Sequence, residues 1–282
     1  MRPNRTKGNK SNPLPGFGIT LGFTVLYLSA LVLLPIAVLL IKSLSLSWSD
    51  LWKAATSHRA LSAYGLSLGA SFVAAFLNAI FGSLLAWVLV RYRFPGRRFL
   101  DGLVDFPFAL PTAVGGLTLA NLFSPNGWLG HYLVPHGIEG QSSRLGVVIA
   151  LTFVGLPFSV RTLQPVLENL DKGVEEAAAI LGAGRLRTFW SVIGPTLLPT
   201  ILTGFGLAFA RGLGEYGSII FISGNIPNYT EIAPQLVVIR LEESAGVYSG
   251  AIGVALVLMV FSFALLFTLN WLQGWSSKFQ RA

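Results

Sequence analysis

Long apolar runs with almost no charge constrain the fold of this chain more than any other feature. A helix needs about 20 mainly apolar residues to cross a hydrocarbon core of about 30 Å. Charged residues make up 11% of the chain, against about 25% in an ordinary soluble domain. We therefore predict an all-α, polytopic membrane protein with six transmembrane helices. The predicted spans cover residues 17–41, 66–90, 103–123, 145–160, 195–223 and 250–272.

The first run follows a basic tail, residues 1–16, that contains four Lys or Arg residues. A secretory signal peptide is the alternative explanation for such a start, but its apolar core spans only about 7–15 residues. Residues 17–41 are long enough to cross a bilayer, so we interpret them as the first transmembrane helix.

The Lys and Arg residues predict the orientation. Six spans place both termini on one side, together with the loops at 91–102 and 161–194, and this side holds fourteen of the twenty Lys and Arg residues. The positive-inside rule then predicts that both termini are cytoplasmic. The cluster from Arg91 to Arg98 fits a topology anchor that contacts lipid headgroups better than a site for a soluble anion.

Several classes of site are absent from the sequence. There is no Cys, and the three His residues are scattered, so no metal constellation is predicted. The net charge of +8 is spread between apolar runs, which argues against nucleic acid as a partner. The nearest approach to a nucleotide-binding loop, Gly8 to Ser11, lacks the adjacent Gly-Lys pair. We predict a chain that is not an enzyme and binds no cofactor, so energy must come from a partner.

A polar stretch within the loop 161–194 has the pattern of a short helix. Asp171 is a plausible N-cap, and Gly182 can adopt the left-handed conformation that ends a helix. The apolar positions between them share one helical face, at Val174, Ala177, Ala178 and Leu181. The pattern fits either a helix that docks into a groove on a soluble partner or an ordinary amphipathic interface helix.

A second apolar stripe follows this turn, at Leu186, Phe189, Trp190 and Ile193. We expect Pro195 to stop that helix, because proline lacks the backbone N–H and clashes with the preceding turn. The stretch is therefore predicted to be a helix, a tight turn and a helix.

Arg211 and Glu215 are charges inside a predicted span. Arg211 lies twelve residues beyond Pro199, about 18 Å along a helix, so we expect it near mid-membrane. Glu215 is one turn further on and can pair with it. The pair is either a positive site in an anion pathway or a neutralised structural pair at a helix interface.

The polar stretch resembles the EAA loop of ABC importer permeases. The resemblance rests on Glu176-Ala177-Ala178, Gly182, Val192 and the Pro195/Pro199 pair. One position departs from the family's pattern, because Gly194 stands where the family commonly has Leu. In that family the loop is a coupling helix that docks into the ATP-binding subunit.

Longer stretches resemble the T-type (CysT) permeases of sulfate/thiosulfate ABC importers. These are residues 63–101, 105–127, 157–170 and 214–234. The resemblance implies an ABC type I importer permease fold, with the type-1 transmembrane domain at 62–272 and the cytoplasmic coupling loop at 161–194. It assigns coupling to the ATPase to Glu175, Glu176, Ala177, Ala178, Leu181 and Gly182. It leaves Arg211 and Glu215 as candidates for an anion pathway.

The same resemblance implies partners and a location. The partners are a homologous W-type permease, two ATP-binding subunits that use ATP, a periplasmic sulfate/thiosulfate-binding protein and membrane lipids. The location is a bacterial inner membrane, although organelle-envelope members exist in the family. A molybdate or tungstate permease is the nearest alternative, and a passive anion channel or membrane scaffold is the alternative from another class. Dependence of uptake on ATP would separate these classes.

Overall fold

A computed structural model describes residues 16–243 and 248–279. The chain divides into two units, Met1–Ser47 and Trp48–Ala282. The described part of the first unit contains α1 (Phe17–Leu44), which is long and apolar enough to cross a membrane. Most of the predicted basic tail, residues 1–15, lies outside the described part of the chain.

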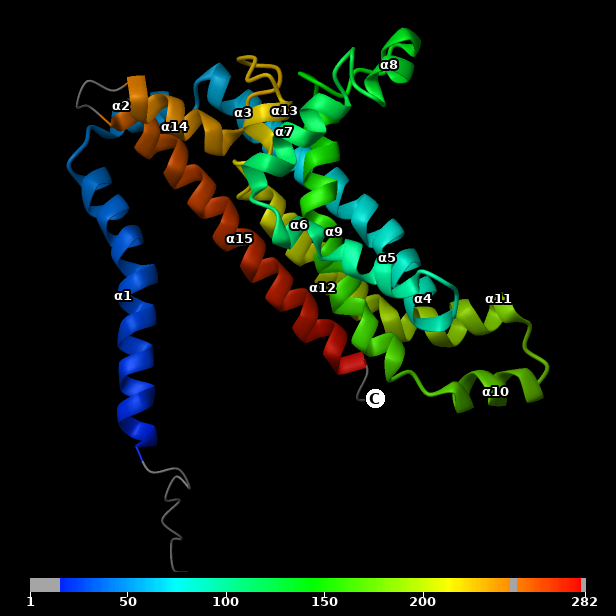
Figure 1. The fold of residues 1–282 in the computed structure, drawn as a ribbon. Coiled ribbons are helices and arrows are strands. Elements are labelled where there is room, and N and C mark those ends of the chain that lie inside the picture. Colours follow the sequence, from blue (N-terminus) through cyan, green and yellow to red (C-terminus); the bar gives the residue numbers. More distant parts are fainter. Residues whose placement is uncertain (1–15, 244–247, 280–282) are drawn as a thin grey trace, which may run out of the picture. The chain divides into compact units, whose positions relative to one another are not determined.

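The second unit is built from helices and turns (Figure 1). Its elements are α2 (Trp48–Ala55), α3 (His58–Leu77), η1 (Asn78–Gly82), α4 (Ser83–Arg91), α5 (Arg97–Val104), α6 (Phe106–Ala109), α7 (Thr112–Leu122), α8 (Gly130–Leu133), η2 (Val134–His136), α9 (Arg144–Glu168), α10 (Lys172–Ile180), α11 (Arg185–Thr188), η3 (Phe189–Ile193), α12 (Gly194–Leu213), α13 (Ile219–Ile222), α14 (Ala233–Glu243) and α15 (Ser249–Phe279). Elements η1 and η3 are single π-helical turns inside longer helical stretches, and η2 is a short 3₁₀ helix.

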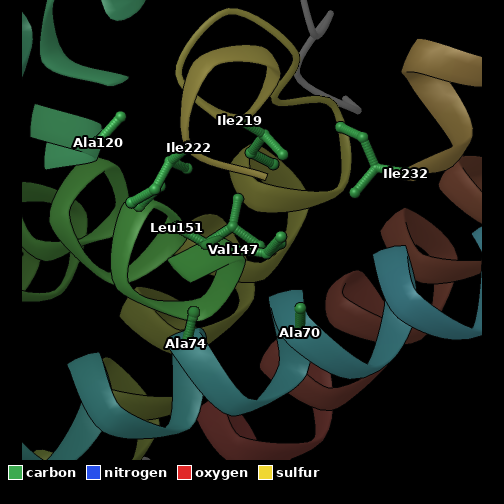
Figure 2. Close-up of a cluster of buried hydrophobic side chains, with 9 residues drawn as sticks. Ala70, Ala74, Ala120, Val147, Leu151, Ile219, Ile222 and Ile232 are labelled. Carbon is green, nitrogen blue, oxygen red and sulfur yellow. The ribbon is translucent and has the colours of Figure 1, made fainter. Parts of the chain in front are cut away.

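Three helices form the centre of this unit. The most extensive contacts between described elements join α9 to α12, and α3 to both. At one end of α9, Val147 and Leu151 pack with Ala70 and Ala74 of α3 and with α13 (Figure 2). At the other end, Leu163 and Leu167 of α9 pack with the residues that begin α12. The long helices therefore bury small or branched apolar side chains against one another.

The outer faces of the long helices are also apolar. Phe72 and Phe76 of α3 are about half exposed, and Val260 and Phe267 of α15 are more than 60% exposed. Water would not solvate such a surface favourably, whereas lipid chains would. Among the described residues, five helical stretches are long and apolar enough to span a membrane. These are 17–44, 58–91, 144–168, 185–213 and 249–271.

The predicted span at 103–123 is not one helix. The chain instead forms α5, α6 and α7, of which only α7 exceeds ten residues. Pro107 lies in the first turn of α6 and Pro111 immediately precedes α7. Each proline removes a backbone donor and restricts the residue before it, so the helix restarts twice rather than bending once.

The other predicted spans differ from the structure at their ends. The span predicted at 145–160 continues to Glu168, with Pro157 and Pro165 inside the helix. The span predicted at 195–223 ends at Leu213 and is followed by a turn and the short helix α13. Parts of the predicted polar loops are helical too, as α2, the start of α3 and α14.

Candidate functional site

The helix expected between Asp171 and Gly182 is present as α10. The Asp171 carboxylate accepts a hydrogen bond of 2.8 Å from the Gly173 N–H, which is the expected N-cap. At the other end, the Gly182 N–H donates to Ala179 O and the Ala183 N–H donates to Ala178 O. These two bonds with Gly182 at φ +79° form a Schellman motif, which turns the chain sharply.

The end of α10 presents apolar side chains outward. Ile180 and Leu181 are 86% and 87% exposed, and Leu186 beyond the turn is 73% exposed. We call Ile180, Leu181 and Leu186 the exposed tip. Glu176 and Ala177 are also exposed, whereas Ala178 is half-buried. The turn between α10 and α11, which carries the exposed tip, extends away from the other helices of this unit (Figure 1). Such a surface is suited to burial against another protein.

The start of α10 is fastened to the membrane-length helices. Glu175 forms an ion pair with Arg91 at the end of α4, 84 residues earlier in the chain. The Arg91 guanidinium also lies over the Trp87 ring, 5.2 Å from its centroid. Trp87 in turn meets Phe189 edge to face at 6.0 Å. These contacts therefore link the start of α10 to α4, and α4 to η3.

An open cavity of about 450 Å³ lies between the start of α10 and the ends of α9 and α12 that flank it. Its walls come from the end of α9, from Asp171 and Glu175, and from Val192, Ile193 and Thr196 at the start of α12. Because this cavity separates α10 from the ends of α9 and α12, the Glu175–Arg91 ion pair in the first turn is what holds α10 to the other helices.

The second helix of the stretch does not stop at Pro195. Residues 185–213 form one helical stretch through α11, η3 and α12. The π-helical turn at Phe189–Ile193 ends two residues before Pro195 and shifts the hydrogen-bond pattern there. A local π turn can accommodate a residue that lacks its own N–H, so the helix continues.

A second charged cluster joins α9 to α5 and α6. Arg161 bonds Asp105 through two nitrogens, at 2.8 and 2.6 Å, and bonds Asp101 at 2.7 Å. Gln164 also donates to Asp101. The hydrogen bond from Gln164 and the nearby Arg161 guanidinium lower the pKa of the Asp101 carboxyl. This cluster fixes the broken segment 97–109 to the helix that leads into α10.

Arg211 and Glu215 are paired, with 2.5 Å between guanidinium and carboxylate. Glu215 is 2% exposed and also accepts bonds from the N–H and hydroxyl of Ser218. Arg211 is 35% exposed. We expected Arg211 near mid-membrane. The helical stretch instead runs from 185 to 213, so Arg211 lies in its last turn.

Two of these contacts could not be found from the sequence. Arg91 was interpreted with its neighbours as a topology anchor, and nothing in the spacing links it to Glu175. Arg161 gave no signal either, because its partners Asp101 and Asp105 are more than 50 residues away. Ion pairs between helices depend on how the helices pack, which periodicity does not specify.

Residues 78–281 match the family model described as "binding-protein-dependent transport system inner membrane component". The chain is 49% identical over 256 residues to a probable sulfate transport system permease protein of Nephroselmis olivacea, covering 91% of this chain and 89% of the relative. It is 46% identical over 261 residues to the sulfate transport system permease protein of Salmonella typhimurium, covering 93% and 94%.

A solved structure shares the fold. It is a bacterial alginate ABC transporter in complex with an alginate pentasaccharide-bound periplasmic protein, at 17% identity. The TM-score is 0.72 over 90% of this chain and 92% of that chain. At that identity the likeness concerns the fold alone.

Proposed function

The chain belongs to the family of binding-protein-dependent transport system inner membrane components, and we propose that it is the permease subunit of an ATP-driven importer of sulfate. The observation that carries the proposal is the identity of 46–49% to sulfate transport permeases over about nine-tenths of both chains. Thiosulfate, which has the same charge and a similar tetrahedral shape, is the proposed second substrate.

The exposed tip is the proposed contact with an ATP-binding subunit. Ile180, Leu181 and Leu186 offer an apolar surface that a soluble partner can cover. Glu175, Glu176, Ala177, Ala178, Leu181 and Gly182 are the proposed coupling residues. The excess of Lys and Arg on the loops that share this side supports a cytoplasmic location, where ATP is available.

The complete importer is proposed to contain four further chains. A homologous W-type permease supplies the other half of the pathway, two ATP-binding subunits supply energy, and a periplasmic protein delivers the anion. The family description, which names binding-protein-dependent transport, supports the last of these. We place the assembly in a bacterial inner membrane with both termini of this chain in the cytoplasm.

Coupling requires the ATP-binding subunits to bind α10 differently in two states. A ligand shifts a conformational equilibrium only by the difference between its affinities for the two states. Closure of the ATP-binding subunits would pull α10, and the Glu175–Arg91 contact would pass the movement to α4. The cavity behind α10 gives it room to move.

Arg211 is the proposed positive site on the anion pathway. Its guanidinium is 35% exposed, whereas the Glu215 carboxylate is buried and bonded to Ser218 as well. Arg211 can therefore face an anion while Glu215 holds it in place. The competing interpretation is a purely structural ion pair, which a paired substitution distinguishes below.

Labelled sulfate uptake tests the proposal. Proteoliposomes containing the whole complex should accumulate sulfate with ATP and the binding protein, and omission of this chain should abolish accumulation. Excess unlabelled thiosulfate should compete. Uptake without ATP would indicate a passive channel, and preferential competition by molybdate would identify the other oxyanion class.

A further inference from the structure

The three central helices meet along a seam of glycines and buried polar residues. We define the seam by Ser71, Asn78, Gly82, Gly155, Ser159, Gly204 and Gly212. A Cβ built on Gly82 would lie 2.8 Å from the Ser159 Cβ, and one built on Gly204 would lie 3.1 Å from the Ser159 Cα. A Cβ on Gly212 would meet the Ser71 side chain at 3.2 Å. Helices α3, α9 and α12 therefore approach as closely as glycine permits.

Each polar side chain of the seam is buried and unpaired. Asn78 and Ser71 are 1% exposed, and Ser159 is 5% exposed. Neither the amide oxygen nor the amide nitrogen of Asn78 bonds to any described residue, and neither do the hydroxyls of Ser71 and Ser159. Such groups raise the free energy of the state that contains them.

The hydroxyls of nearby threonines behave differently. Thr152 and Thr162 on α9, and Thr203 on α12, each donate to the carbonyl four residues earlier, at 2.6–2.9 Å. This local bond is available to any serine or threonine in a helix. Ser71 and Ser159 do not make it, so their unpaired state is particular to the seam.

A π-helical turn lies at the same place. Element η1 begins at Asn78 and ends at Gly82, within the membrane-length stretch 58–91. A π turn adds a residue to one turn of helix, costs hydrogen-bond quality and often marks a functional position. Figure 2 shows the flank of the seam, where Ala74 of α3 lies beside Leu151 of α9. Small residues let these surfaces approach closely, and the Asn78 amide lies against Gly155, where a Cβ would come within 2.5 Å of its nitrogen.

We propose that this seam is the surface on which α12 slides against α3 and α9 during transport. In the other state of the cycle, Asn78, Ser71 and Ser159 gain hydrogen-bond partners that they lack here. The unpaired groups raise the energy of the present state relative to a state in which they are paired. This inference rests on the proposed transport cycle, since a protein with a single state has no use for such a surface.

Asn78→Leu tests the seam, because leucine has nearly the same shape and no polar atoms. If Asn78 is unpaired only in this state, the variant should unfold at a higher temperature as purified complex. Its sulfate uptake should fall by about fivefold or more, because the second state loses its partner. Thr162→Val is the matched control, since its hydroxyl is satisfied within its own helix, and both readouts should change little. A lower unfolding temperature, which a tightly bound water on Asn78 would cause, or unchanged uptake overturns the proposal.

A cross-link tests the sliding itself. A Cβ built on Gly155 lies 3.4 Å from the Ala208 Cβ, close to the spacing of a disulfide, and the chain has no cysteine of its own. Gly155→Cys with Ala208→Cys should abolish uptake when oxidised and recover it on reduction. The cysteine at position 155 itself displaces the Asn78 amide. Uptake by the oxidised form is therefore compared with uptake by the reduced double variant and not with the unsubstituted chain. Transport by the cross-linked form at the reduced rate would overturn the proposal.

The two proposals can fail separately. If the unsubstituted complex takes up no sulfate, the proposed substrate is wrong. The unfolding temperature of Asn78→Leu still decides whether the seam holds an unpaired group.

Discussion

Gly182 and Gly184 lie in the same exposed turn, but only Gly182 has a backbone conformation that requires glycine. Gly182 has φ +79°, which side chains with a branched Cβ adopt only under strain of about 1–3 kcal/mol. Gly184 has φ −67° and ψ 157°, in the extended region that valine favours. Neither glycine has an atom within 4 Å of a Cβ built on it. Backbone conformation alone therefore distinguishes the two positions.

We predict that Gly182→Val distorts the turn after α10 and uncouples transport. Sulfate uptake should fall about fivefold or more, while the amount of chain in the membrane stays normal. Gly184→Val is the matched control and should transport normally. Wild-type uptake by Gly182→Val would remove the turn from the coupling mechanism.

A double substitution distinguishes the two proposed roles of the Arg211–Glu215 pair, a positive site on the anion pathway or a purely structural ion pair. Arg211→Leu leaves a buried carboxylate without its partner, which costs about 3–5 kcal/mol and should reduce assembly. Adding Glu215→Gln removes that charge, so assembly of the double variant should recover. Uptake should not recover, because the positive site is still missing. Recovery of both assembly and uptake, measured on purified complex, would make the pair structural.

At the scale of elements, the Arg161 cluster ties α5 and α6 to α9, and it depends on pH through Asp101. The folded chain lowers the pKa of this carboxyl below the ordinary value of about 3.9. A lowered pKa means that stabilisation is complete well above 3.9 and is lost as the pH falls through the folded value.

We therefore expect Asp101→Asn to lower the unfolding temperature of the purified complex at pH 7. The difference from the unsubstituted chain should shrink as the pH falls below 4, because protonation then removes the same charge. Arg98→Gln, on the same helix but without a described partner, is the control. A difference that stays constant with pH would mean that the Asp101 charge does not stabilise the fold.

The short helix α10 was the most predictable element. Asp171 and Gly182 delimit α10 through local chemistry, which the sequence displays directly. The ends of the long helices were less predictable, because proline acts according to context. Pro107 and Pro111 restart the helix, whereas Pro157 and Pro165 lie inside α9 and Pro195 follows a π turn. Packing against neighbouring helices decides whether a proline interrupts a helix or lies within it. The Arg91–Glu175 contact also depends on how the helices pack, so the sequence does not display it.

At the scale of the whole molecule, α9 separates two segments that each expose a large apolar side chain. Before it lies the segment containing α8, with Trp128 75% exposed, and after it lies α10 with Leu181 87% exposed. A helix of 25 residues is about 37 Å long, enough to cross the hydrocarbon core. The account requires that these two residues face opposite sides of the membrane and that Leu181 faces the ATP-binding subunit.

Labelling of single cysteines tests this requirement most directly, since the chain has none of its own. Leu181→Cys should react with an impermeant maleimide only in inside-out vesicles, and the co-expressed ATP-binding subunit should protect it. Trp128→Cys should react only in right-side-out vesicles. Reaction of Leu181→Cys from the outside would contradict the account, because no ATP-binding subunit could then reach the exposed tip.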